Sequence, residues 1–134
     1  MSSFSKVLII DDDSIHNMVS SKLIEKAGFA DKTDKVLSGK LALEYLNRNA
    51  KENTLPELIF LDINMPLMDG WEFLEHFNEI RNGFGKDIHV LMLTSSISPG
   101  DIEKSKEHPL VFEFVTKPLS IDKLNDIKHS LLPA

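Results

Sequence analysis

The chain has 134 residues, of which 42% are hydrophobic, so it can bury a sizeable core, and we expect a single domain over residues 1–134 without an output domain. Its 21 acidic residues outnumber its 15 basic ones, and the formal net charge of −6 argues against binding to nucleic acid or to a membrane surface. The chain has no cysteine, which excludes thiolate chemistry. It also has no apolar run of ~20 residues and no signal peptide, and we therefore expect a cytoplasmic protein.

Short apolar runs alternate along the chain with segments of helical periodicity. The run KVLII at residues 6–10 predicts a buried strand, and the helix after it begins with Ser14 as its N-cap and ends at Gly28. Apolar residues recur in this helix at helical spacing and predict the face that packs on the core. These residues are Ile15, Met18, Val19 and Leu23.

The middle of the chain continues the alternation. The polar segment 32–37 predicts an edge strand, and a helix follows around residues 41–46. The run LIFL at residues 58–61 predicts a strand buried on both faces. The helix after it has an apolar side formed by Trp71, Phe73, Leu74 and Phe77.

The last third of the chain predicts two more strands, at residues 88–93 and 111–115, and two more helices. Ser98 begins a capping box with Pro99 at the first helical position, and Ser120 opens the final helix. The apolar side of that helix contains Ile121, Leu124, Ile127 and Leu131.

Regular alternation of strand and helix predicts an α/β fold, a doubly wound five-stranded parallel sheet with helices on both faces. The strand order 2-1-3-4-5 fits a polar second strand at one edge, although the residues alone do not fix the order. Because all strands point the same way, their carboxyl ends lie along one rim.

Polar side chains follow four of the predicted strands at that rim. Asp62 follows the third strand, and Thr94 and Lys117 follow the fourth and fifth. Three carboxylates follow the first strand, those of Asp11, Asp12 and Asp13. Clustered carboxylates repel one another, and an oxygen-rich site favours Mg²⁺. A metal and an ammonium could together neutralise a phosphoryl group carried on an aspartate.

The motifs VLIIDDD, LIFLDINMPLMDG, VLMLTSS and FVTKPLS resemble those of the receiver domains of two-component response regulators. The resemblance runs from Lys6 to about Leu132 and is to the stand-alone, chemotaxis-type members. It implies the flavodoxin-like (βα)5 fold with strand order 2-1-3-4-5. It also implies a domain that takes a phosphoryl group from a histidine kinase and catalyses only its own phosphorylation and slow autodephosphorylation.

The same resemblance assigns the site residues. It implies that Asp62 is the phosphoacceptor and that Mg²⁺ is held by Asp12 directly, by Asp11 through water, by Asp62 and by the backbone carbonyl of Asn64. Asp13 matches no ligand position, and we expect it to support the start of the first helix.

The resemblance further implies that Thr94 hydrogen-bonds the phosphoryl group and that Lys117 pairs with its oxygens. It implies a cis peptide between Lys117 and Pro118. Phe114 occupies the aromatic position that, with Thr94, forms the switch of the family. We expect the phosphoryl group to draw Thr94 toward it and Phe114 to rotate inward.

The expected partners are proteins. A sensor histidine kinase or a histidine phosphotransfer protein is the expected donor. A downstream protein target is expected to bind the face formed by the fourth helix, the fifth strand and the fifth helix.

Two other functions share parts of this pattern. A haloacid-dehalogenase-like Mg²⁺-dependent phosphohydrolase also uses an aspartate nucleophile, but it needs a second acid two residues later, where this chain has Asn64. A flavodoxin-like electron carrier needs a hydroxyl-rich phosphate loop, and this chain has DDDS there. None of the five histidines has metal-ligand spacing, and only His16 is expected near the rim.

Overall fold

A computed structural model describes residues 3–95 and 98–132, so the last serine of the VLMLTSS motif and both chain ends lie outside the described residues. The elements in chain order are β1 Phe4–Ile10, α1 Ser14–Lys26, β2 Ala30–Val36, α2 Gly39–Glu52, β3 Leu58–Asp62, α3 Gly70–Ile80, the 3-10 turn η1 Arg81–Gly83, β4 His89–Thr94, α4 Pro99–Glu107, β5 Val111–Thr116 and α5 Ile121–Leu131. Among these helices, none is long and apolar enough to cross a membrane.

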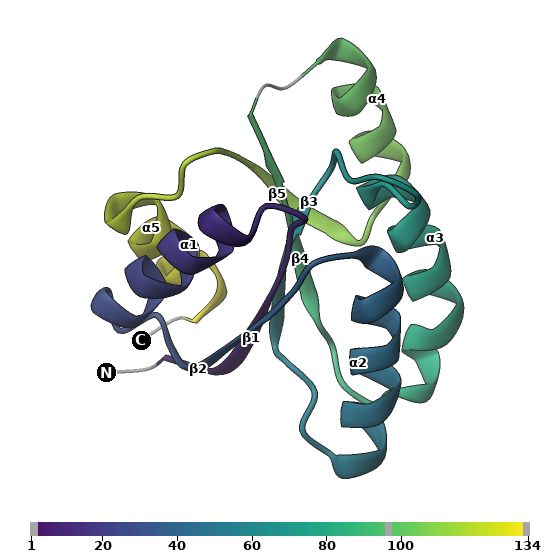
Figure 1. Cartoon of the computed structure of the whole chain (residues 1–134), viewed down its shortest axis with the longest axis horizontal. Coiled ribbons are helices and arrows are strands. Elements are labelled where there is room, and N and C mark those ends of the chain that lie inside the picture. The colour runs from purple at the N-terminus through teal and green to yellow at the C-terminus, as the bar shows by residue number, and fades with distance from the viewer. Residues whose placement is uncertain (1–2, 96–97, 133–134) are drawn as a thin grey trace.

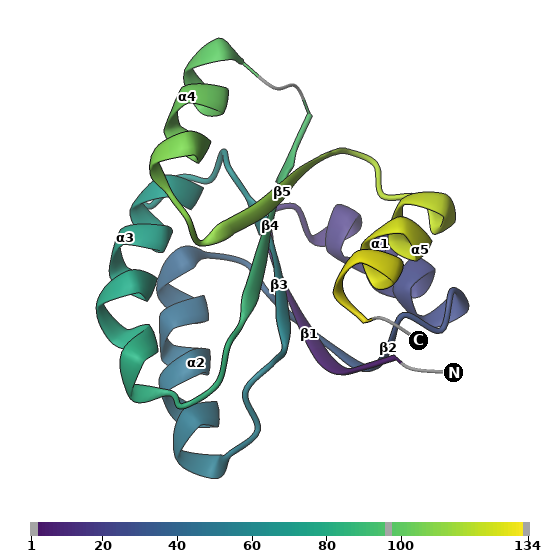
Figure 2. The same cartoon turned by 180° about the vertical axis from the view of Figure 1, so that it is seen from behind.

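The five strands form one parallel sheet in the order β2-β1-β3-β4-β5. Helices α1 and α5 cover one face of the sheet and α2, α3 and α4 lie on the other side (Figure 1), as the view from behind also shows (Figure 2). The predicted doubly wound α/β class and strand order are therefore confirmed.

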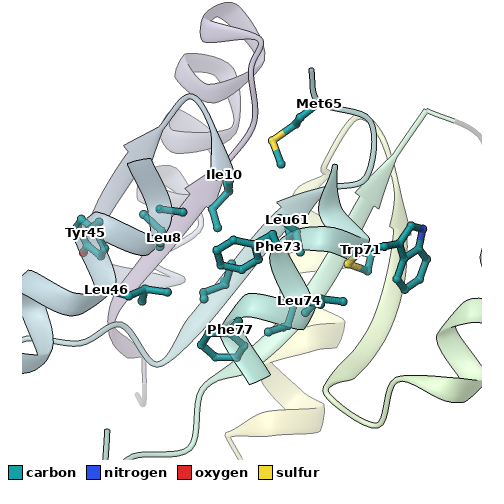
Figure 3. Close-up of a cluster of buried hydrophobic side chains, with 14 of the residues drawn as sticks. Leu8, Ile10, Tyr45, Leu46, Leu61, Met65, Trp71, Phe73, Leu74 and Phe77 are labelled. Carbon is teal, nitrogen blue, oxygen red and sulfur yellow. The ribbon is translucent and has the colours of Figure 1, made fainter. Parts of the chain in front are cut away.

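Two hydrophobic clusters lie on the two faces of the sheet, and β1 contributes to both. Leu8 and Ile10 pack with α2 and α3 in one cluster (Figure 3), whereas Val7 and Ile9 pack with α1 and α5 in the other. Successive side chains of a strand point to opposite faces, so a central strand covered on both sides needs a continuous apolar run. This is why KVLII and LIFL contain so few polar residues.

The predicted apolar face of α1 is wrong for three of its four residues. The exposed side chains, with exposed fractions of 68%, 48% and 44%, are Ile15, Met18 and Val19. The buried residues of the helix are instead Asn17, Ser20 and Ile24. On this inward face Ile24 packs into the core, and Asn17 Nδ2 donates to the backbone carbonyl of Asp11 at 3.0 Å, which satisfies the buried amide. Leu23 is partly buried against the core.

The N-cap of α1 is also different from the prediction. Asp13 occupies this position, and its Oδ1 accepts from the backbone N–H groups of Ile15 at 3.0 Å and His16 at 3.1 Å, so Ser14 is the first helical residue. A carboxylate at this place also suits the positive end of the helix dipole. The expected support of the helix start by Asp13 is confirmed, and Gly28 follows the C-cap with a positive φ of 63°.

Candidate functional site

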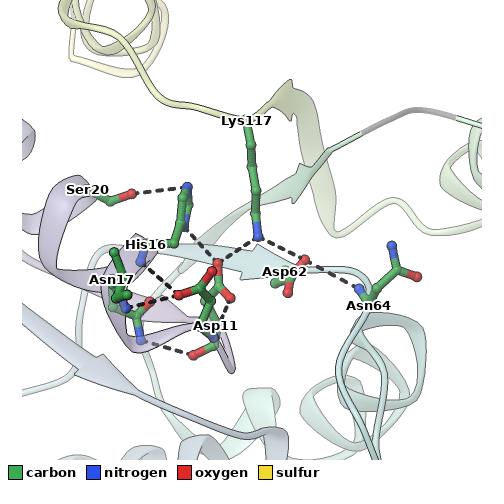
Figure 4. Close-up of polar contacts among 9 residues, drawn as sticks. Asp11, His16, Asn17, Ser20, Asp62, Asn64 and Lys117 are labelled. Atoms are coloured by element: carbon green, nitrogen blue, oxygen red, sulfur yellow. Dashed lines mark hydrogen bonds and ion pairs between the residues drawn. The ribbon is translucent and has the colours of Figure 1, made fainter.

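Strand register brings the carboxylates of the first and third strands together. Ile10 pairs with Leu61 across β1 and β3, so the residues that follow them, Asp11 and Asp62, end side by side at the rim. Carboxylate oxygens of Asp11, Asp12 and Asp62 all lie within 4.8 Å of one another. Asp11 is fully buried and Asp62 is 5% exposed, whereas Asp12 is exposed. This cluster contains the three carboxylates that the sequence placed at a metal site, and Figure 4 shows two of them, Asp11 and Asp62.

Lys117 enters the cluster from the end of β5. Its Nζ lies 2.8 Å from Asp11 Oδ2 and 3.4 Å from Asp62 Oδ1. Its backbone N–H donates to the carbonyl of Thr94 at 2.7 Å, so the ends of β4 and β5 are joined at this point. Thr94 is fully buried at the rim, and the expected cis peptide between Lys117 and Pro118 is present.

The loop after β3 is folded tightly around the carbonyl end of Asp62. The backbone N–H of Asn64 donates to Asp62 Oδ1 at 3.4 Å, and the N–H of Gly70 donates to Ile63 O at 2.8 Å. A Cβ atom at Gly70 would lie 2.8 Å from the carbonyl oxygen of Asp62, so only glycine fits there. Asn64 has an exposed side chain at the place where the phosphohydrolase alternative requires a second acid.

Burial and crowding control the charges of the site. Burial and the neighbouring charge of Asp11 raise the pKa of Asp62 from 3.8 to about 6, although Lys117 opposes them. Burial alone would lower the pKa of Lys117, but the carboxylates of Asp11 and Asp62 outweigh it and raise the pKa. A single ammonium therefore faces several carboxylates, an arrangement that attracts cations.

Phe114 lies on β5, partly buried, and its ring meets the ring of Trp71 edge to face with centroids 6.2 Å apart. Trp71 also contacts α4, since its Nε1 donates to Asp101 Oδ1 at 3.2 Å. The N–H of Asp101 in turn donates to Ser98 Oγ at 3.2 Å, which confirms the predicted cap of α4. The aromatic pair thus connects the predicted switch residue to α3 and α4.

Two further residues contact Asp11 at the rim and were not predicted as site residues. Asn17 holds the backbone of Asp11, and His16 Nδ1 lies 2.8 Å from Asp11 Oδ2 (Figure 4). The proximity of His16 to the rim was expected, but its contact was not. Asn17 gave no distinct signal, because helix α1 contains several other polar residues, including His16, Ser20 and Ser21.

Comparison with known proteins identifies the family. Residues 7–128 match the family model of the response regulator receiver domain. The chain belongs to this family. It is therefore a receiver domain of the kind found in two-component signalling and phosphorelays.

Individual relatives agree with this assignment. The chain is 29% identical over 128 residues to "Sporulation initiation phosphotransferase F" of Bacillus subtilis, covering 96% of this chain and 94% of that protein. It is 30% identical to "Hybrid signal transduction histidine kinase I" of Dictyostelium discoideum over 91% of its own length but only 7% of the kinase. A crystal structure of a two-component response regulator from Cytophaga hutchinsonii superposes with a TM-score of 0.90 at 31% identity, covering 99% of this chain and 100% of that one.

The raised pKa of Asp62 predicts that the free energy of unfolding depends on pH. Because the folded value of about 6 exceeds the ordinary 3.8, the folded state binds more protons between these values, and stability is lost as the pH rises through this window. Replacing the carboxylate by Asp62→Asn should therefore raise the free energy of unfolding by about 3 kcal/mol at pH 8. This gain should shrink steadily as the pH is lowered toward 4.

Urea denaturation of both proteins at a series of pH values measures this difference. Asp126→Asn, at an exposed position on α5, is the matched control and should show no such dependence. A gain from Asp62→Asn that is the same at pH 8 and pH 4 would contradict the raised pKa.

Proposed function

We propose that Asp62 accepts a phosphoryl group from a phosphohistidine in a Mg²⁺-dependent reaction. The observation that carries this proposal is the carboxylate cluster around Asp62, with the ammonium of Lys117 3.4 Å from Asp62 Oδ1. In the transfer, a carboxylate oxygen bonds to phosphorus while the phosphorus–nitrogen bond to the donor breaks. The imidazole nitrogen of the donor keeps the electron pair of that bond.

The donor set fits Mg²⁺, because three carboxylates and a backbone carbonyl are hard oxygen ligands. In this proposal Asp12 and Asp62 bind the metal directly, Asp11 through water, and Asn64 through its backbone carbonyl. Asp11 Oδ2 is buried and has an ion-pair contact with Lys117 at 2.8 Å but no aligned hydrogen bond among the described residues, so it keeps capacity to accept from a metal-bound water. Bound Mg²⁺ would neutralise charge on the phosphoryl oxygens.

Lys117 and Thr94 receive the new charge in this proposal. The ammonium of Lys117 already lies between Asp11 and Asp62, so a short movement would transfer it to phosphoryl oxygens on Asp62. The hydroxyl of Thr94 would donate a charge-assisted hydrogen bond to the same group. Both residues would thereby stabilise the phosphorylated form in preference to the free carboxylate.

The donor is proposed to be a sensor histidine kinase or a histidine phosphotransfer protein. Asp62 is only 5% exposed, so a protein donor would have to cover the rim of the sheet to reach it. The exposed apolar side chains of Ile15, Met18 and Val19 on α1 begin four residues after Asp11, so a protein that covers the rim can bury them. Their burial would favour a protein donor over free phosphate compounds.

The proposal predicts that acetyl phosphate adds one phosphoryl group to the protein and that the addition requires Mg²⁺. Intact-mass spectrometry should detect this group in the parent protein and not in Asp62→Asn. The neighbouring Asp13→Asn is the control, since asparagine is an equally good N-cap and Asp13 lies outside the cluster.

Two results would contradict the assignment of Asp62. One is a modification of equal extent in Asp62→Asn, and the other is a modification that persists in excess chelator. Loss of phosphorylation in Asp13→Asn as well would indicate that the substitutions disturb the loop rather than the acceptor.

Signal output is proposed to pass from Thr94 to Phe114 and then to the face of α4, β5 and α5. Phe114 has no hydroxyl, so its outward position has no hydrogen bond to keep and its inward position buries apolar surface. Its contact with Trp71, which also hydrogen-bonds Asp101 on α4, gives this movement a route to that face. A difference of a few kcal/mol between the two positions suffices for phosphorylation to shift the population.

Thr94→Ala should still accept a phosphoryl group but should lose most of the response around Phe114, because the hydrogen bond that draws the β4 loop inward is gone. NMR spectra recorded before and after addition of Mg²⁺ and beryllofluoride measure this response. Thr116→Ala is the matched control, since Thr116 pairs with Thr94 in the sheet but has an exposed side chain. Equal responses of Thr94→Ala and the parent around Phe114 would show that Thr94 does not transmit the signal.

A further inference from the structure

The first turn of α1 places a histidine against a carboxylate of the site. His16 Nδ1 lies 2.8 Å from Asp11 Oδ2, and the histidine side chain is only 14% exposed. Its other ring nitrogen, Nε2, lies 3.5 Å from the hydroxyl of Ser20, one turn further along the helix (Figure 4). The imidazole therefore lies between a hydroxyl of its own helix and a carboxylate at the end of β1.

Asp11 depends on a small set of groups for its orientation. Its Oδ1 accepts from the backbone N–H of Asp13 at 2.9 Å, and its Oδ2 is 2.8 Å from both Lys117 Nζ and His16 Nδ1. The carboxylate is fully buried, so water cannot replace a lost partner without entering the site. Each of these contacts therefore restricts the rotation of the carboxylate.

Lys117 contacts both Asp11 and Asp62, whereas His16 contacts Asp11 alone of these two carboxylates. The ammonium of Lys117 is also 3.4 Å from Asp62, and in the proposed function it moves to the phosphoryl oxygens. Asp11 Oδ2 would then lose its cationic partner at the moment when the site carries the most negative charge. Of the groups in contact with Oδ2, His16 alone does not touch Asp62 in the described structure.

We propose that His16 is a positioning residue that holds Asp11 in the orientation required for Mg²⁺, a role that rests on the proposed Mg²⁺-dependent function. The Nδ1–H group of the imidazole is the donor toward Asp11 Oδ2, and Nε2 accepts from the Ser20 hydroxyl. His16 thus acts on the metal through Asp11 and is not itself a ligand.

The proposal requires one particular tautomer. Two bare acceptors 2.8 Å apart would repel each other, so we place the proton on Nδ1. Neither His16 Nδ1 nor Asp11 Oδ2 has an aligned hydrogen bond in the described structure, so the proposal also requires a small turn of the ring that completes the bond. Partners in the outer shell of a metal site commonly orient the ligands in this way.

Nitrogen NMR of protein labelled with ¹⁵N-histidine tests the contact without metal or phosphoryl donor. The expected result is a proton on His16 Nδ1, detectable from the ring nitrogen shifts. A ring with its proton on Nε2 alone would overturn the proposal, whatever the protein does with Mg²⁺.

Calorimetric titration with Mg²⁺ tests the effect on the metal. His16→Leu removes the donor and should weaken Mg²⁺ binding about tenfold. His16→Asn keeps an N–H donor close to the position of Nδ1 and should recover most of the affinity. His76→Leu, the same change at an exposed histidine of α3, should bind Mg²⁺ like the parent.

The outcomes separate this inference from the proposed function. A parent protein that binds no Mg²⁺ contradicts both. Parent and His16→Leu with equal affinities contradict only the role of His16, and so does a His16→Asn variant that is as weak as His16→Leu. If His16→Leu does not fold, the tautomer and the affinity of His16→Asn relative to the parent still decide the question.

Discussion

Parallel pairing of β1 and β3 is the constraint on which the rest of this site depends. Both strands end at the same rim and in register, so the residues that follow them, Asp11 and Asp62, are forced into proximity by the backbone. Hydrophobic packing on both faces of the sheet holds this register, since a slip by one residue would disrupt the close packing of both clusters and move the polar strand ends toward the core. The energy that brings these carboxylates together therefore comes from the core.

The proximity of these carboxylates concentrates negative charge at the rim, and Lys117 neutralises only part of it. Among the described residues, three carboxylates lie together and the ammonium of Lys117 contacts two of them, Asp11 and Asp62. The pKa of Asp62 rises to about 6 because burial and Asp11 outweigh Lys117. A divalent cation at the cluster would restore the balance, and a phosphoryl group would then add charge that Lys117 is already placed to meet. The destabilised free carboxylate and the proposed capacity of Asp62 to accept a phosphoryl group would thus have the same physical origin.

Sequence patterns predicted most of this fold and site because the signals were local. Apolar runs such as LIFL and the polar residues that follow them fixed the strands and their rim, and the family resemblance supplied the strand order that the residues left open. The orientation of α1 was mispredicted because helical periodicity identifies an apolar face without showing whether that face is inward. The inward face of α1 combines the packing of Ile24 with a tertiary hydrogen bond from Asn17 to the carbonyl of Asp11, and neither can be read from periodicity.

The same rotation of α1 explains why two features occur together at the rim. Turning Asn17 and Ser20 inward brings His16 to the edge of the site and leaves Ile15 and Met18 on the surface. An exposed apolar surface and a polar contact to Asp11 therefore follow from one helix orientation. Because His16 and Asn17 both contact Asp11, a proposed partner that shifts α1 would change the orientation of a proposed metal ligand. Under these proposals, docking at the helix and metal binding at the cluster would be coupled through Asp11.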